Sequence, residues 1–383
     1  MLGWLREAAT RHSVTLLSFT TEPIDSAARS VLTDLCERVV TVERPSLGPI
    51  STAVRAAWTG APHNLVPFDS GEMRSRVAEW ARPELTDVVQ IELLHMARYG
   101  DVLPADLPRV LRTHNVESSI LSGFAKLQRN PALAAYARLQ AQRLHRYEAG
   151  ILPSFDRCLA ISDLDAASLR AMAPEAKVEA IPVGIDAKHF RPGVLAVETD
   201  PWRIATMGDY AWAPTRDGLR FLIEDILPRI RADLPGVRLS VIGRDPPELG
   251  AGAACSGIDV LGRVPDVRPE ILRAAVFVAP TRMGSGIRVK TLEALALGRP
   301  VVSTSLGSSG IDVRSGEHLL VADDAAAIAA HVGDLLRDPE RAARLGAAAS
   351  ARIRERYAWS AVLDRFDDVY ARALAERRSE RRR

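Results

Sequence analysis

Short apolar segments alternate with longer amphipathic segments along the whole of this 383-residue chain. Each apolar segment has at most seven residues and is rich in valine, isoleucine or leucine, as strands buried on both faces are. The amphipathic segments, such as residues 217–234 and 290–298, are long enough for helices. This alternation predicts an α/β fold with parallel, doubly wound sheets. The expected strands are residues 14–19, 39–43, 88–94, 109–113, 157–162, 178–183, 202–208, 237–243, 258–262, 275–280, 300–305 and 318–323.

One segment without periodicity divides the chain into two halves of similar size. Residues 182–200 contain Pro182, Gly184, Pro192 and Gly193 and show neither a helical nor an alternating pattern. We interpret this segment as an interdomain linker. Ligands of parallel sheets bind beyond the carboxyl ends of the strands, so two such domains predict a ligand site in the cleft between them.

Composition excludes several classes of protein. No apolar run approaches the roughly 18 residues of a membrane-spanning helix, and the first residues lack the features of a secretory signal. The three cysteines lie far apart, which excludes a disulfide scaffold and favours the reducing cytoplasm. A net charge of +2 and few, scattered aromatic residues argue against a nucleic-acid partner. The basic tail, residues 377–383, is either solvated charge or a peripheral contact with the anionic inner face of the plasma membrane.

The most informative segment is residues 279–311. An expected strand ends at Pro280, a glycine-containing loop follows (Gly284, Ser285, Gly286 and Ile287), and a helix begins near Lys290. A glycine loop that leads into a helix N-terminus binds anions, because free backbone N–H groups and the helix dipole both attract them. Arg288 and Lys290 add positive charge at the same point. The loop matches neither the Walker motif nor the dinucleotide fingerprint. It is therefore either a diphosphate site or a tight turn with solvated cations.

These residues resemble the donor-site block of retaining glycosyltransferases of family 4, also called group 1. Further matches are LEALALGRPVVST (292–304), GRVPDV (262–267) and RYAWSAVLDRFDDVYARAL (356–374), with weaker matches in VVQIELLHM (88–96) and RTHNVES (112–118). The variant G-S-G-I-R-V-K is similar to a branch associated with exopolysaccharide synthesis in bacteria. The resemblance implies the GT-B architecture, with two Rossmann-like domains facing across a cleft. The expected organisation is an acceptor-side domain (1–181), the linker (182–200), a donor domain (201–357), a terminal helix that returns to the first domain (358–376) and the basic tail (377–383).

The resemblance also assigns roles to residues. Glu293 matches a glutamate that hydrogen-bonds the donor ribose, and the expected donor-binding set is Gly284, Ser285, Gly286, Ile287, Glu293, Arg216, Gly208 and Val264. Ser285 stands where the family has the first glutamate of this motif, eight residues before Glu293, and Asp209 stands where it has a diphosphate-binding arginine. We therefore expect that Arg288 and Lys290 supply the cations instead, and we assign them catalytic roles.

Residues near strand ends in the first half are further candidates. His114 ends an expected strand, and the family has a histidine there near the transferred sugar, so we assign His114 a catalytic role; a purely structural role is the alternative. Glu117 is expected to cap or pair within the next helix, and Glu92 is a weaker candidate. Asp163 and Asp165 spell D-x-D, but they open a helix after Ser162, and we expect the serine and aspartates at this helix start to be capping residues rather than metal ligands.

The start of the chain differs from the pattern of the family. Residues 1–12 have a helical apolar face of Leu2, Leu5, Ala8 and Ala9, whereas family members begin with a strand and a glycine-rich loop. We therefore expect that the first strand of the N-terminal domain is missing.

Together these observations predict a glycosyltransferase that moves a sugar from a UDP- or GDP-sugar to a saccharide, lipid-linked or small-molecule acceptor with retention of configuration. No cofactor and no metal are implied, and a cytoplasmic location is expected. Two alternatives stay open: a nucleotide-sugar 2-epimerase on the same fold, and a non-catalytic subunit that binds nucleotide sugars or serves as a scaffold.

Overall fold

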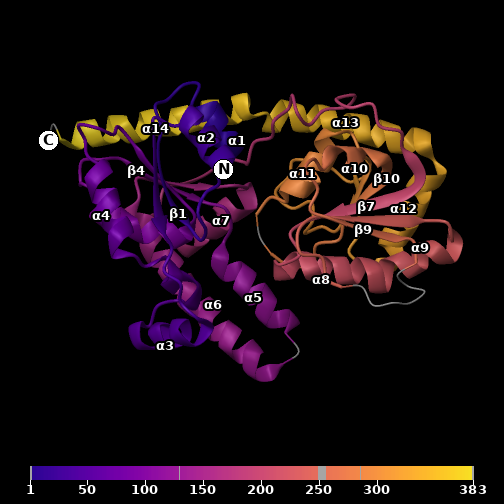
Figure 1. Ribbon diagram of the computed structural model, residues 1–383, viewed down its shortest axis with the longest axis horizontal. Helices are drawn as coiled ribbons and strands as arrows, with labels where there is room; N and C mark the ends of the chain where they lie inside the picture. Colours follow the sequence, from indigo (N-terminus) through magenta and orange to yellow (C-terminus); the bar gives the residue numbers. More distant parts are fainter. Residues whose placement is uncertain (1, 129, 249–255, 285, 382–383) are drawn as a thin grey trace. The chain divides into compact units, whose positions relative to one another are not determined.

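The computed structural model describes residues 2–128, 130–248, 256–284 and 286–381 (Figure 1). The chain forms two compact units. Unit 1 comprises Met1–Gly184 and Trp359–Arg383, and unit 2 comprises Ile185–Ala358. The boundary falls near the beginning of the segment that we interpret as a linker, because residues 185–199 belong to unit 2.

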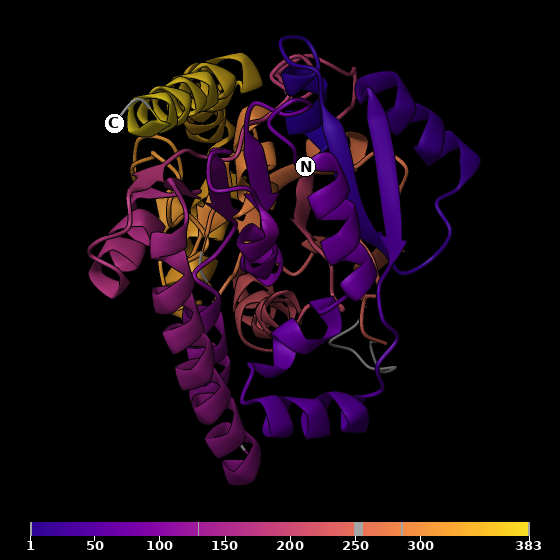
Figure 2. The ribbon, with the colours of Figure 1, turned by 90° about the vertical axis from the view of Figure 1, so that its left-hand side faces the viewer.

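Unit 1 holds six parallel strands in two sheets. One sheet pairs β1 with β2, and the other has the order β3-β4-β5-β6. Among the described residues no strand pairs with the second edge of β1 or β3. Figure 2 faces unit 1 and shows the indigo pair apart from the other strands. The elements are α1 (Leu2–Ala8), β1 (Thr15–Thr20), α2 (Ser26–Leu35), β2 (Arg38–Glu43), α3 (Pro49–Thr59), η1 (His63–Phe68), α4 (Gly71–Trp80), β3 (Val89–Glu92), η2 (Leu94–Val102), β4 (Arg109–Thr113), α5 (Glu117–Leu127), α6 (Pro131–Ile151), η3 (Leu152–Ser154), β5 (Arg157–Ala160), α7 (Asp163–Met172), β6 (Val178–Ala180) and α14 (Trp359–Arg381).

The two ends of the chain contribute to one hydrophobic cluster of unit 1. Trp4 of α1 meets Phe366 of α14 edge to face, with 6.1 Å between the ring centroids. Trp359 at the start of α14 packs so closely that a Cβ on Gly184 would lie 2.3 Å from its ring. The expected apolar face of the first helix was partly wrong. Leu2 is exposed while Trp4, Leu5 and Ala8 are buried, because α14 covers the side that carries Trp4.

Unit 2 is a single six-stranded parallel sheet with the order β12-β11-β10-β7-β8-β9. Its core holds Ile204 of β7, Val241 of β8 and Val276 of β10, all fully buried. The elements are β7 (Asp200–Met207), α8 (Ala213–Phe221), the π-helical turn η4 (Leu222–Ile226), α9 (Leu227–Asp233), β8 (Arg238–Ile242), β9 (Ile258–Gly262), α10 (Arg268–Arg273), β10 (Ala274–Ala279), α11 (Val289–Ala296), β11 (Val301–Ser303), β12 (Leu320–Val321), α12 (Ala325–Arg337) and α13 (Pro339–Tyr357).

The helix expected over residues 217–234 begins earlier, at Ala213, and contains the π turn η4. Pro228 explains this turn. Proline has no N–H to donate to the carbonyl four residues before it, and the neighbouring Leu227 N–H bonds to Leu222, five residues back. All twelve expected strands are present, within a few residues of the expected bounds.

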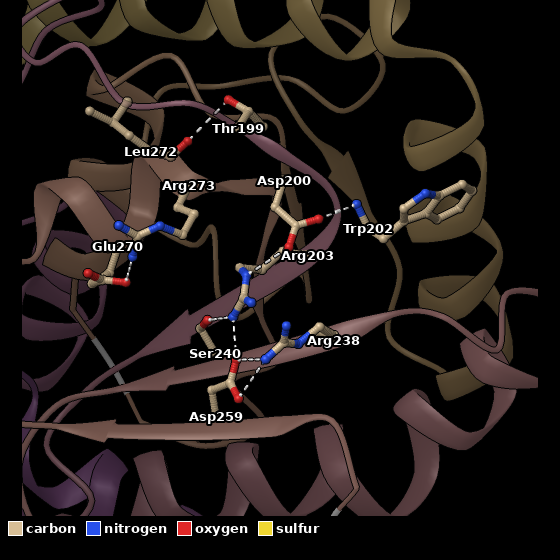
Figure 3. A network of polar contacts seen from close by, with 10 residues as sticks. All are labelled: Thr199, Asp200, Trp202, Arg203, Arg238, Ser240, Asp259, Glu270, Leu272 and Arg273. Atoms are coloured by element: carbon tan, nitrogen blue, oxygen red, sulfur yellow. Dashed lines mark hydrogen bonds and ion pairs between the residues drawn. The ribbon is translucent and has the colours of Figure 1, made fainter.

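A charged network ties three strands of unit 2 together near their amino-terminal ends (Figure 3). The Arg203 guanidinium donates to Ser240 at 2.8 Å and to Asp259 at 2.5 Å, and to Asp200 at 3.2 Å. Arg238 reaches the same Asp259 carboxylate at 3.0 Å. The network lies at the opposite end of these strands from the carboxyl-terminal edge, so it supports the sheet and leaves that edge for other groups.

Candidate functional site

The sheet order of unit 2 places a site between β7 and β10. From β7 the chain continues to β8 and β9 on one side, and then returns to β10, β11 and β12 on the other side. Ligands of open parallel sheets bind at such a reversal, beyond the carboxyl ends of the two central strands. Gly208 follows β7, and the glycine loop 280–288 follows β10, so the two segments with predicted donor-binding residues meet at this point.

Gly208 lies where any side chain would collide with its neighbours. A Cβ there would be 2.4 Å from Cγ2 of Thr215 and 3.5 Å from Nζ of Lys290. Gly243, which follows β8 with φ +129°, is equally restricted, because its Cβ would lie 1.8 Å from the Gly208 carbonyl oxygen. The backbone after β7 is therefore held close to the Lys290 ammonium group.

The loop after β10 turns through two left-handed glycines, Gly284 (φ +113°) and Gly286 (φ +79°). A Cβ on Gly284 would lie 2.8 Å from the Arg288 guanidinium, which donates to the Gly286 carbonyl at 3.1 Å. Ile287 is buried. Ser285 lies outside the described residues. Arg288 thus folds back over the loop and brings its charge to the N-terminus of α11.

Helix α11 is fixed at both ends. Thr291 donates its hydroxyl to the Gly307 carbonyl at 3.0 Å, and Ser350 of α13 donates to the Ala296 carbonyl at 2.8 Å. Among the described residues, no side chain caps the N-terminus of α11 at Arg288. Thr291 and Leu292 donate their backbone N–H groups to the Arg288 carbonyl, so the N–H groups of Val289 and Lys290 remain available to an anion at the edge of the sheet.

Lys290 is half-buried and has no hydrogen-bond or ion-pair partner among the described residues. Burial, together with the neighbouring Arg288 charge, lowers the pKa of Lys290 to about 8. A buried cation without a carboxylate partner is costly for the protein alone. An anionic ligand removes that cost, so the environment of Lys290 favours a bound phosphate group.

Glu293 lies three residues further along α11 and is also half-buried. Burial raises the pKa of its carboxyl group to about 7. No ion pair joins it to Lys290 within the described part of the chain. Its carboxylate is therefore an acceptor that the protein itself leaves unused, as a hydroxyl-binding group requires.

Other predicted donor residues have partners within unit 2. Arg216 donates to the carbonyls of Tyr210 at 3.1 Å and Ala211 at 2.9 Å, so it supports the loop after β7. Its role in donor binding stays a prediction. Val264 is half-buried in the turn after β9, at the same edge of the sheet. Sequence reasoning missed Arg244, which follows β8 and donates to Asp209 at 2.6 Å.

In unit 1, His114 follows β4, and its Nε2 lies 2.5 Å from the Glu92 carboxylate at the end of β3. Arg112 is buried 3.6 Å from the same carboxylate, and Gln90 donates to it at 2.5 Å. Burial alone raises the pKa of Glu92, but the Arg112 charge and the His114 contact hold it below its ordinary value. Tyr370 of α14 donates to Gln90, so the C-terminal helix joins this network. The pairing of Glu92 with His114 could not be read from their spacing in the sequence.

A carboxylate of α6 caps α5, the helix that follows β4. Glu148 of α6 accepts the backbone N–H groups of Glu117 at 2.7 Å and Ser118 at 3.1 Å. Burial raises the pKa of Glu148 to about 7. The cap that we expected from Glu117 is thus supplied by a residue far away in the sequence. The expected capping role of Ser162 in the D-x-D segment is confirmed, because its hydroxyl accepts the Asp165 N–H at 3.0 Å.

In the described part of the chain, no three histidine, cysteine, aspartate or glutamate side chains gather where they could hold a metal ion. Among the described helices, none is both long enough and apolar enough to cross a membrane.

Known proteins resemble this chain in both fold and sequence. Sucrose-phosphate synthase from Thermosynechococcus elongatus superposes with a TM-score of 0.71 at 20% identity, over 98% of this chain and 92% of the synthase. HepE from Anabaena, solved with UDP and glucose, superposes with a TM-score of 0.65 at 13% identity, over 97% and 94%. These neighbours are GT-B glycosyltransferases, and the chain has their α/β fold.

Comparison of the sequence with known families and proteins points to glycosyltransferases as well. Residues 201–338 match the family Glycosyl transferases group 1. The chain is also 28% identical over 275 residues to a phosphatidyl-myo-inositol mannosyltransferase from Mycobacterium leprae, covering 68% of this chain and 72% of the mannosyltransferase. The predicted family is therefore confirmed.

Proposed function

We propose that this protein transfers a sugar from a nucleotide-sugar donor, UDP- or GDP-linked, to a saccharide, lipid-linked or small-molecule acceptor. The observation that carries the proposal is Lys290, a half-buried cation that has no partner among the described residues and lies beside Gly208 at the reversal between β7 and β10. The match to the group 1 glycosyl transferases and the likeness to HepE, solved with UDP and glucose, support it.

In this proposal Lys290 and Arg288 hold the donor diphosphate together with the first N–H groups of α11. As the glycosidic bond breaks, negative charge grows on the leaving diphosphate. Cations and N–H groups that are already in place stabilise this charge more strongly than they stabilise the bound donor, and this difference accelerates the reaction. The charge on the leaving diphosphate needs no metal ion for this step, so we propose metal-independent transfer. We also propose that the transfer retains the configuration of the donor sugar.

Glu293 would bind the donor ribose. An ionised carboxylate accepts hydrogen bonds from two vicinal hydroxyl groups, and Glu293 has no competing partner in the described residues. His114, oriented by Glu92, would act on the acceptor side. We also propose a cytoplasmic location and a role in exopolysaccharide synthesis, which follow from the sequence resemblance alone.

The test is incubation of the full chain with a panel of UDP- and GDP-sugars and candidate acceptors, with and without EDTA. The proposal predicts release of a nucleoside diphosphate and a product with the anomeric configuration of the donor, unaffected by EDTA. Inversion at C2 of the sugar would identify an epimerase instead. Binding without turnover for every donor and acceptor would identify a non-catalytic subunit.

A further inference from the structure

Helix α3 carries a row of exposed apolar side chains. Ile50, Val54 and Trp58 follow one another at intervals of four residues and are 81%, 63% and 92% exposed. The opposite side of the helix is buried at Thr52 and Ala56. The helix is therefore amphipathic with its apolar row turned away from unit 1, which is unusual because such a row normally packs against the core.

A second helix adds to this surface. Leu133, Tyr136 and Leu139 of α6 are 42%, 41% and 46% exposed. The segment after α3 connects the two helices, because the Tyr136 hydroxyl lies 3.2 Å from Nδ1 of His63. Figures 1 and 2 both show α3 and the first half of α6 at the same end of unit 1. We call these six side chains the apolar face of unit 1.

The two segments of the chain that carry this face contain basic but no acidic residues. Residues 44–68 and 118–147, which contain α3 and most of α5 and α6, hold no aspartate or glutamate. At the average acid content of the chain, a stretch of this length would hold about seven. The same segments hold the basic residues Arg44, Arg55, Lys126, Arg129, Arg138, Arg143 and Arg146. Arg55 is paired with Asp69 at 3.2 Å, while Arg138 and Arg146 are exposed on α6.

We propose that the apolar face of unit 1 docks on an anionic lipid bilayer. Exposed tryptophan and aliphatic side chains beside arginines are the composition that binds the interface of a membrane, where apolar side chains enter the acyl boundary and cations meet lipid phosphates. A second copy of this chain is a poor occupant, because two faces of the same charge repel each other in a symmetric dimer. The basic tail, residues 377–383, contributes less to lipid binding than this face does, since Arg377 is paired with Asp156 at 2.8 Å.

The proposal is independent of the transferase activity and is tested by co-sedimentation of the full chain with vesicles. Vesicles of phosphatidylcholine with about 30% phosphatidylglycerol are compared with pure phosphatidylcholine, at about 0.05 M and 0.5 M salt, since salt screens surface charge. The variants are Ile50→Ser/Val54→Ser/Trp58→Ser and Arg138→Glu/Arg146→Glu. Trp202→Ser and Arg344→Glu are matched controls, because both side chains are exposed in unit 2.

The expected result is binding to the anionic vesicles that weakens in high salt and falls at least roughly tenfold in each multiple variant. Both controls should bind like the wild type. Circular dichroism confirms that the variants are folded. The proposal is overturned if the wild type does not bind the anionic vesicles, if it binds pure phosphatidylcholine equally well, or if the α3 variant binds like the wild type. A dimer that the α3 substitutions dissociate, without vesicle binding, would assign the face to self-association instead.

Discussion

Lys290 and Glu293 lie one turn apart on α11, yet neither neutralises the other. Burial shifts both pKa values toward neutrality, that of Lys290 down to about 8 and that of Glu293 up to about 7. Unpaired groups of this kind destabilise the protein and cluster at binding sites. The two residues therefore give predictions for activity and for stability that can be measured separately.

In the proposed reaction, Lys290 must carry its proton to stabilise the leaving diphosphate. Its charge is present below pH 8 and is lost above it, so kcat/KM for the donor should fall about tenfold per pH unit on the alkaline side. Lys290→Ala should lower kcat by about a hundredfold or more. Lys290→Arg keeps the charge at alkaline pH and should remove the alkaline decline, even if its rate is lower. An unchanged pH profile in Lys290→Arg would assign the decline to another group.

Glu293→Gln should weaken donor binding and stabilise the free protein. A lost charged hydrogen bond costs about 1.5–3 kcal/mol, or roughly ten- to a hundredfold in affinity by calorimetric titration. In the wild type the folded-state pKa is raised, so the free energy of unfolding decreases as pH rises from about 4.5 to 7. At pH 8 the variant should therefore be more stable by about 1–3 kcal/mol. Equal affinity in both proteins would contradict the ribose assignment.

At the scale of elements, the two ends of the strands in the sheet of unit 2 carry different groups of residues. The Arg203 network holds β7, β8 and β9 together near their amino-terminal ends (Figure 3), and the groups that we propose bind the donor follow β7 and β10 at the other end. Burial alone raises the pKa of Asp259, but the hydrogen bonds from Arg203 and Arg238 lower it below its ordinary value. The network therefore stabilises the fold at neutral pH, and this stabilisation is lost as pH falls below about 4.

Arg203→Met should destabilise unit 2 by about 2–4 kcal/mol at pH 7, because it leaves the Asp200 and Asp259 carboxylates without their buried partner. Arg238→Met is the matched control, since its side chain is 51% exposed and should cost less than about 1 kcal/mol. Denaturant unfolding measures both values. Equal stability of Arg203→Met and Arg238→Met would show that the buried Arg203 does not hold the network together.

The elements were largely predictable because strands buried on both faces leave continuous apolar runs in the sequence. The run 109–113 coincides with β4, and 258–262 coincides with β9. Contacts between distant residues could not be predicted in the same way. The cap of α5 by Glu148 and the pair of Asp209 with Arg244 leave no pattern in the neighbouring sequence. In each case the two residues are far apart in the chain, and only the fold brings them together.

At the scale of the whole molecule, the two units carry different groups. Where β7 and β10 end, unit 2 has cations and a carboxylate that has no partner in the described part of the chain, whereas unit 1 has the His114–Glu92 pair and an exposed apolar face. The sequence resemblance predicts the roles of Glu293 and His114, and the positive charge beside the glycine loop predicts that of Lys290; these three roles stay predictions. The apolar face could not be predicted from the sequence, because its apolar residues are spaced as in an ordinary helix that packs on a core.

The central claim is that unit 2 binds the nucleotide donor at the reversal between β7 and β10. Hydrogen–deuterium exchange of the full chain, with and without UDP or GDP, tests it most directly. The account predicts protection in peptides covering residues 207–212 and 281–293, reduced in Lys290→Ala, with no comparable protection at the strand ends of unit 1. Protection confined to residues 92–118 of unit 1, with none around α11, would contradict the account.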